Sequence, residues 1–221
     1  MWNATVNMDI IKIIKENTKK HSDWFYIRTK NSNKRMQNEE LYTNLVFLEY
    51  KRKISQSLLS GNTCEQFIIF AKENKLGCCV KNKSEITTFL KEGSQNNDKK
   101  LLILHTIAEV EHYIGKVKAL INNEDSSLKM SLDKLLKPMG GTRTLQIIFL
   151  LWYVLSPINI EEIKVNRNEI QLQLENLIKF FKQAYNPLEK DTKFKEFNEI
   201  IRIFWDKYII ADAQDRELER V

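Results

Sequence analysis

The chain has 221 residues, enough for one large or two small domains, and its hydrophobic content of 43% is that of a globular protein, which argues against general disorder. Its net charge of +6 is uneven, because residues 1–60 carry 11 basic against 6 acidic side chains and residues 189–221 carry 7 against 9. A basic N-terminal part suits a polyanion such as nucleic acid, although a lysine-rich composition that only keeps the protein soluble explains it equally well.

The cysteines and the apolar segments indicate the compartment. The three cysteines are odd in number and two of them, Cys78 and Cys79, are adjacent, which argues against a disulfide framework and favours a reducing compartment. No cysteine or histidine group has the spacing of a zinc site. The longest apolar run, 147–155, is too short to cross a bilayer, and the N-terminus lacks the order of a signal peptide. We therefore expect a cytoplasmic protein with no membrane partner.

Residues 1–93 predict a small mixed α/β domain. The run at 24–27 is aromatic and β-branched, which favours a strand. The dense apolar run LVFLEYK at 45–51 is typical of a strand that is buried on both faces. The elements expected here are a helix over 9–20, strands at 24–27 and 45–51, a helix over 64–74, a strand at 78–80 and a helix over 84–90 closed by Gly93.

Residues 99–221, after a polar linker, predict an all-helical domain. Apolar residues recur at helical spacing along most of it, and the run at 145–155 is apolar on every side, which indicates an enclosed helix. The helices expected are 100–121, a short one from Ser126 or Ser127 to before Pro138, one capped by Thr142 and ending at Leu155, one over 163–184, and one over 194–208. The predicted fold class is therefore α+β, a small mixed sheet followed by a helical half.

The order of elements around residues 45–51 carries a family resemblance. A helix, a strand, a strand ending in Glu49-Tyr50-Lys51, a helix and a strand follow one another, and Gln66 lies on the second helix. This arrangement resembles the PD-(D/E)xK nuclease superfamily, most of all its virus-type replication-repair branch, over residues 8–92. The resemblance implies a restriction-endonuclease-like fold, in which Glu49, Lys51 and Gln66 belong to the catalytic site.

The chemistry of such a site explains these residue types. Residues two apart on a strand face the same side, so Glu49 and Lys51 would share one site. Two carboxylates bind Mg²⁺ or Mn²⁺, the metal lowers the pKa of its bound water, and Lys51 stabilises the charge that develops. The family's Pro-Asp dipeptide is missing, so the second acid is Glu40, with Glu39 or Asp23 as alternatives.

Two further patterns bear on partners. The segment at 24–35 interleaves aromatic residues with basic ones, which would stack on and clamp nucleic acid; the alternative is that Trp24 and Tyr26 belong to the core. The basic residues of this candidate interface are Arg28, Lys30, Lys34 and Arg35. Arg143 follows two glycines before a helix, a place where phosphate can bind, but a glycine loop with a helix cap is the favoured interpretation.

One helical face collects His105, Glu109 and His112, at positions that could ligate a metal ion. A di-iron bundle needs a second Glu-x-x-His pair, and the only other histidine is His21. This face is opposite the apolar stripe of the same helix. We therefore expect it to face solvent.

Together these patterns predict a metal-dependent nuclease acting on DNA or RNA, with a helical half that binds substrate or a partner. The alternative is a non-catalytic helical subunit that binds nucleic acid or protein within a larger assembly, including a homo-oligomer. The state of residues 45–51 distinguishes the two hypotheses, because a strand favours the nuclease and a helix favours the binding protein.

Overall fold

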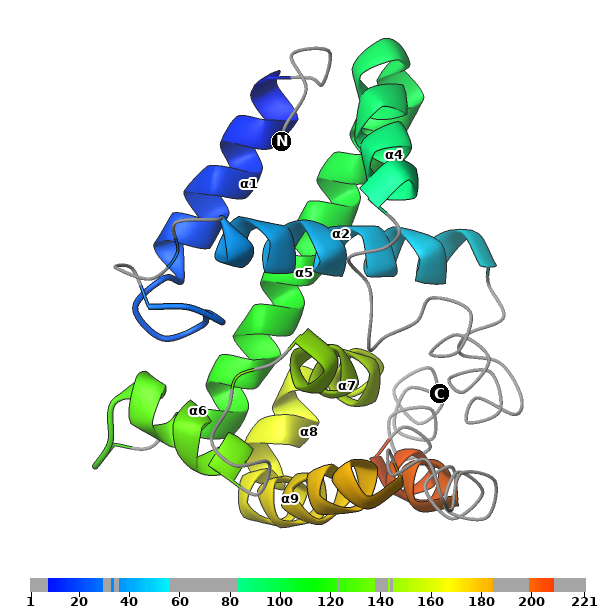
Figure 1. Cartoon of the computed structure of the whole chain (residues 1–221). Helices are drawn as coiled ribbons and strands as arrows, with labels where there is room; N and C mark the ends of the chain where they lie inside the picture. Colours follow the sequence, from blue (N-terminus) through cyan, green and yellow to red (C-terminus); the bar gives the residue numbers. More distant parts are fainter. Residues whose placement is uncertain are drawn as a thin grey trace.

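The protein, seen here as a computed structural model, is helical in the part of the chain that the structure describes (Figure 1). That part comprises residues 8–29, 33, 36–55, 83–122, 124–137, 143, 145–184 and 199–208. Its helices are α1 (Met8–Lys20), α2 (Gln37–Ser55), α4 (Lys83–Gln95), α5 (Asn97–Ile121), α6 (Leu128–Leu136), α7 (Leu145–Leu155), α8 (Ile160–Val165) and α9 (Arg167–Ala184), followed by a helical segment at 199–208.

The α+β prediction with a small mixed sheet is wrong, because the run at 45–51 lies inside the 19-residue helix α2. Residues 41–49 are all buried, since α1, α4, α5 and α7 pack around this helix. An enclosed helix accepts apolar residues on every side just as a doubly buried strand does. Residues 24–27 form turns and bends rather than a strand, and the elements predicted at 64–74 and 78–80 lie outside the described residues.

Helix α5 is the central element of the fold (Figure 1), with α1, α2 and α4 packed along its N-terminal part and α6 to α9 around the rest. The predicted amphipathic stripe is confirmed, and its residues are all at most 4% exposed: Ile103, Ile107, Val110, Ile114, Val117 and Ile121. Buried side chains from the two predicted halves belong to a single hydrophobic cluster. Asn96 alone separates α4 from α5, and its side chain caps α5 by accepting from the backbone N–H groups of Asp98 and Lys99.

Helix α4 continues past Gly93, where the sequence predicted its end. A Cβ atom at this position would collide with the buried side chain of Ile103 on α5 and would lie 3.3 Å from Cδ1 of Ile10 on α1. The glycine thus allows close packing of three helices rather than capping one.

Helix α7 is enclosed, as predicted, and none of residues 147–155 is more than 3% exposed. Two carbonyl groups at its C-terminal end receive donors from other elements, because no further turn of helix follows. Lys116 Nζ of α5 donates to the carbonyl of Ser156 at 2.6 Å, and the indole N–H of Trp205 donates to the carbonyl of Val154 at 3.1 Å. The ammonium group also opposes the negative end of the α7 dipole.

The single helix predicted over 163–184 is two helices, α8 and α9, which meet at Asn166. The first residues of α9 in turn cover the end of α5. Arg167 Nη1 donates to the carbonyl of Asn122 at 2.8 Å, and Gln171 Nε2 donates to the carbonyl of Leu120 at 2.6 Å. The turn therefore places two donors on the free carbonyl groups of the central helix.

Candidate functional site

Glu49 is a buried structural carboxylate, 2% exposed, on the enclosed part of α2. Its Oε1 accepts from the guanidinium of Arg52, with Nε at 2.9 Å, and its Oε2 accepts from the indole N–H of Trp152 at 3.0 Å. The indole belongs to α7, so this acid joins two helices that pack together. Both oxygens are already occupied by donors, which is how a buried carboxylate is stabilised.

Glu40, the predicted second metal ligand, does not converge on Glu49 in a helix. Glu49 is nine positions after Glu40, which places the two residues on opposite sides of α2 and about 13 Å apart along its axis. Positions two apart, such as 49 and 51, also lie on different sides of a helix rather than on one face. Gln66 lies outside the described residues. Glu40 and Glu49 therefore do not fit a Mg²⁺ or Mn²⁺ site, since one ion needs its oxygen ligands at 2.0–2.1 Å.

The remaining acids and histidines do not supply another metal site in the part of the chain that is described, where no group of three or more histidine, cysteine, aspartate or glutamate side chains could hold an ion. Glu39 accepts from Asn33 Nδ2 at 2.9 Å, and Asp23 is exposed. His105 lies 3.6 Å from Glu109, and both His105 and His112 are exposed. The prediction that this face of α5 meets solvent is therefore confirmed for its two histidines.

The basic segment after α1 is positioned by Asn38 of α2. Its Oδ1 accepts from the backbone N–H groups of Ile27 and Arg28 at 3.0 and 2.9 Å, and its Nδ2 donates to the carbonyl of Arg28 at 2.8 Å. Arg28 itself is exposed and donates through Nε to Gln37 Oε1. The other predicted nucleic-acid contacts, Lys30, Lys34 and Arg35, lie outside the described residues.

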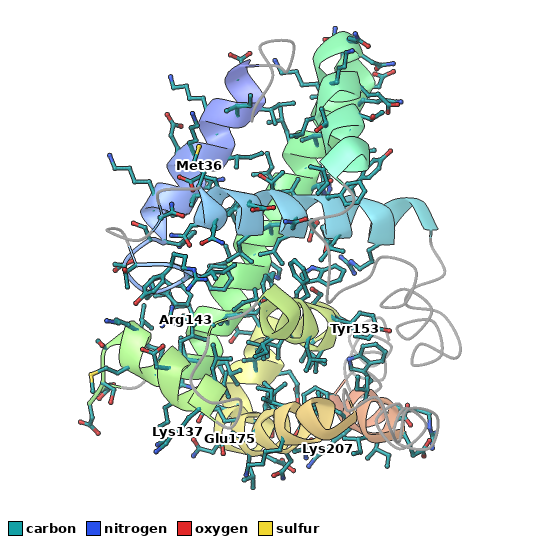
Figure 2. The ribbon with its side chains drawn as sticks, in the orientation of Figure 1. Met36, Lys137, Arg143, Tyr153, Glu175 and Lys207 are labelled. Atoms are coloured by element: carbon teal, nitrogen blue, oxygen red, sulfur yellow. The ribbon has the colours of Figure 1, made fainter. Side chains whose placement is uncertain are left out.

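The aromatic residues of this segment belong to the core. Trp24, Phe25 and Tyr26 are 4%, 4% and 7% exposed, so they are not a stacking surface for bases. The guanidinium of Arg143 lies 4.1 Å over the Tyr26 ring, and it donates to the carbonyls of Trp24 and Tyr26. Arg143 lies between this segment and α6 (Figure 2), where its Nε donates to Asp133 at 2.8 Å. It is therefore a structural clamp rather than a phosphate ligand.

A cluster of polar groups joins α1, α2 and α5, and we call it the Glu111 cluster: Asn17, Lys20, His21, Tyr42 and Glu111. Glu111 Oε1 and Oε2 lie 3.1 and 3.0 Å from His21 Nε2, Lys20 Nζ lies 2.7 Å from Oε2, and the Tyr42 hydroxyl donates to Oε1 at 2.8 Å. Asn17 donates to the Tyr42 oxygen. This cluster could not be predicted from the sequence, because His21 and Glu111 are 90 residues apart and no local pattern links them.

These contacts change the acidity of the two oxygen acids. Partial burial acts to raise the pKa of Glu111, but the hydrogen bonds from His21, Lys20 and Tyr42 outweigh it and hold that pKa at about 2, against an ordinary 4.5. Burial raises the pKa of Tyr42, and the neighbouring Glu111 carboxylate raises it further. The carboxylate is therefore charged, and the phenol neutral, at physiological pH.

This shift predicts an acid-dependent loss of stability. A carboxyl group with a lowered pKa in the folded state stabilises it fully above pH 4.5, and that contribution falls as the pH drops from 4.5 toward 2. Between pH 7 and pH 3 the contribution of Glu111 should fall by about 1–2 kcal/mol, because water screens part of the interactions of this half-buried group. Urea unfolding of the wild type and Glu111→Gln at both pH values measures it, and the variant should lack this part of the pH dependence. Glu109→Gln, two residues away on α5, should retain it; equal pH dependence in all three proteins would contradict the prediction.

The outer face of α1 presents a row of lysines, which we call the α1 lysine face: Lys12, Lys15 and Lys19. At 100° per residue these positions fall within about 60° around the helix axis, opposite the buried Ile10 and Ile14. All three are exposed, and neither Lys15 nor Lys19 has an acidic partner among the residues that the structure describes.

The acids of α1 do not cancel this charge. Glu16 lies 4.0 Å from Lys12 and both side chains are well exposed, so this pair is weak. Asp9 pairs with Lys100 of α5 at 3.2 Å, which offsets its charge from outside the helix. The α1 lysine face thus remains a positively charged surface.

Comparison with known proteins gives no family for the chain: no family model matches it, and no curated protein or solved structure matches it either. Within the described residues no helix is both long enough and apolar enough to cross a membrane.

Proposed function

We propose that the protein is a non-catalytic helical protein that binds nucleic acid through its basic N-terminal segment. The observation that carries the proposal is the placement of charge. Residues 8–36 contain eight lysines and arginines against three acids, a net +5, whereas the whole chain carries +6. A positive charge concentrated in 29 residues favours binding of a polyanion such as nucleic acid, because each phosphate that a lysine or arginine neutralises releases counterions.

The fold supports this assignment, because the basic residues of this segment that the structure describes are all exposed: Lys12, Lys15, Lys19, Lys20 and Arg28. The lysines of α1 lie opposite its buried face, and Asn38 fixes the backbone on which Arg28 is exposed. A binding role is favoured over nuclease chemistry by α2, since a helix at 45–51 was the outcome expected for the binding protein. Binding of phosphates by these lysines and arginines also requires no metal ion.

The test of this proposal reverses the α1 lysine face with Lys12→Glu, Lys15→Glu and Lys19→Glu in one protein. Each replacement changes the charge by two, so the net charge becomes zero. Affinity for nucleic acid should fall about ten-fold or more, and the slope of log K against log salt should flatten by about 2–3, because three phosphate contacts are lost. Fluorescence anisotropy titrations at several salt concentrations measure both.

A matched control reverses three exposed lysines on other helices, Lys118, Lys134 and Lys179, and reaches the same net charge. It should bind nearly as the wild type does at 0.15 M salt, where distant charges are screened. Equal loss in both variants would mean that only total charge matters. An unchanged slope in the α1 variant would place the contacts elsewhere and overturn the proposal.

A further inference from the structure

The class of nucleic acid that suits this surface follows from which groups of the N-terminal segment are accessible. Proteins that hold single strands gain much of their affinity by stacking bases on exposed aromatic rings, about 1–3 kcal/mol per base. In the described part of residues 8–36 the aromatic side chains are Trp24, Phe25 and Tyr26, and all three are buried. What this region offers a nucleic acid is therefore charge without stacking.

The buried rings are also held in place, so they are not easily released to a ligand. Trp24 packs edge-on against His21 with ring centroids 6.1 Å apart, and Phe25 packs against Tyr113 of α5 at 6.3 Å. Tyr26 lies under the Arg143 guanidinium. Exposing any of these rings would break the contacts between the segment and the core.

The arrangement of the cations fits a duplex. From Lys12 to Lys19 the α1 lysine face extends about 10 Å along a straight helix, close to the axial length of three phosphates on one DNA strand. A duplex carries twice the axial charge density of one of its strands, with about one charge per 1.7 Å, and a surface that binds only phosphate gains most from the denser polyanion.

B-form DNA suits a helix face better than duplex RNA does. The major groove of B-form DNA is about 12 Å wide and admits a helix with phosphates on both sides, whereas the A-form groove is deep and narrow. Helix α1 lies at the outside of the molecule, against α2 and α5 on its inner side (Figure 1), so its lysine face is open to a groove of this kind.

We infer that the α1 lysine face binds double-stranded DNA through its phosphates and with little sequence preference. This inference rests on the proposed nucleic-acid binding and names its ligand class. It further implies that the rings at 24–26 stay packed in the core when DNA is bound.

The experiment compares five labelled 20-mers on the full-length protein by anisotropy: a DNA duplex, each of its two single strands, a second duplex of unrelated sequence, and an RNA duplex of the first sequence. The DNA duplexes should bind within about two-fold of each other and at least about five-fold tighter than either strand, with a steeper salt dependence. The Lys12→Glu, Lys15→Glu, Lys19→Glu protein should lose this preference for duplex, while the Lys118, Lys134 and Lys179 control should keep it.

The other outcomes distinguish a failure of the inference that the ligand is double-stranded DNA from a failure of the proposed nucleic-acid binding. Single strands that bind as tightly as the duplex, or a strong preference between the two duplexes, would overturn the inference and leave nucleic-acid binding standing. Tighter binding of the RNA duplex would overturn the assignment to DNA in the same way. If none of the five ligands binds, both the inference and the proposed nucleic-acid binding are wrong.

Discussion

Replacing Arg143 with methionine should lower the free energy of unfolding by about 3 kcal/mol, because it removes a buried cation that several groups share. The side chain is 5% exposed, it pairs with Asp133 at 2.8 Å, and it donates to the backbone of the segment at 24–26. Methionine fills a similar space but leaves these buried carbonyl groups without a donor. Denaturant unfolding should show a lower midpoint at an unchanged slope.

The matched control is Arg202→Met in the C-terminal helical segment. Arg202 pairs with Glu199 and with Asp206, but it is 55% exposed, so its removal should cost less than about 1 kcal/mol. Arg143→Lys should fall between the two, since lysine keeps the charge but not the fork of donors. If Arg143→Met unfolds at the same denaturant concentration as Arg202→Met, the clamp contributes nothing to stability.

Apart from the enclosed helix α7, the helices that could be predicted from the sequence are those whose faces differ. Helix α1 and helix α5 each have one apolar and one charged face, and the Ser127 cap of α6 is a local signal, so their positions followed from spacing alone. Helix α2 has no polar side in its middle, and periodicity does not separate an enclosed helix from an enclosed strand. The length of the segment would have distinguished the two, because 19 residues without glycine or proline are longer than an ordinary strand. The acidic residues in its first turn also indicate the start of a helix.

The site residues were harder to predict, because their roles depend on contacts between distant parts of the chain. Glu49 meets Trp152 across 103 residues, and Arg143 meets Trp24 across 119. The sequence Glu49-Tyr50-Lys51 is compatible both with a catalytic pair on a strand and with a buried structural acid on a helix. What distinguishes them is the partner that the fold brings to the carboxylate, and local spacing carries no information on it.

Replacing Glu49 with glutamine should lower the free energy of unfolding by about 3 kcal/mol, because it removes the buried negative charge that accepts from the Arg52 guanidinium. Arg52 is only 18% exposed, so water does not fully replace the carboxylate. The indole N–H of Trp152 also loses a charged acceptor. Urea unfolding of Glu49→Gln, Trp152→Phe and the double variant should give a coupling energy of about 1 kcal/mol, because the two changes remove the same hydrogen bond.

The control for Glu49 is Glu40→Gln on the same helix, where the side chain is partly exposed and stability should change by less than about 0.5 kcal/mol. The pair also tests the nuclease hypothesis directly, since both acids were predicted as metal ligands. If a metal site exists, both variants should lose Mg²⁺- or Mn²⁺-dependent cleavage of DNA or RNA while remaining as stable as the wild type. If Glu49 is structural, only Glu49→Gln should be destabilised, and the wild type should cut neither polymer. If the wild type cuts DNA or RNA and both Glu40→Gln and Glu49→Gln abolish the cleavage, the nuclease hypothesis is correct and the proposal of a non-catalytic binding protein is wrong.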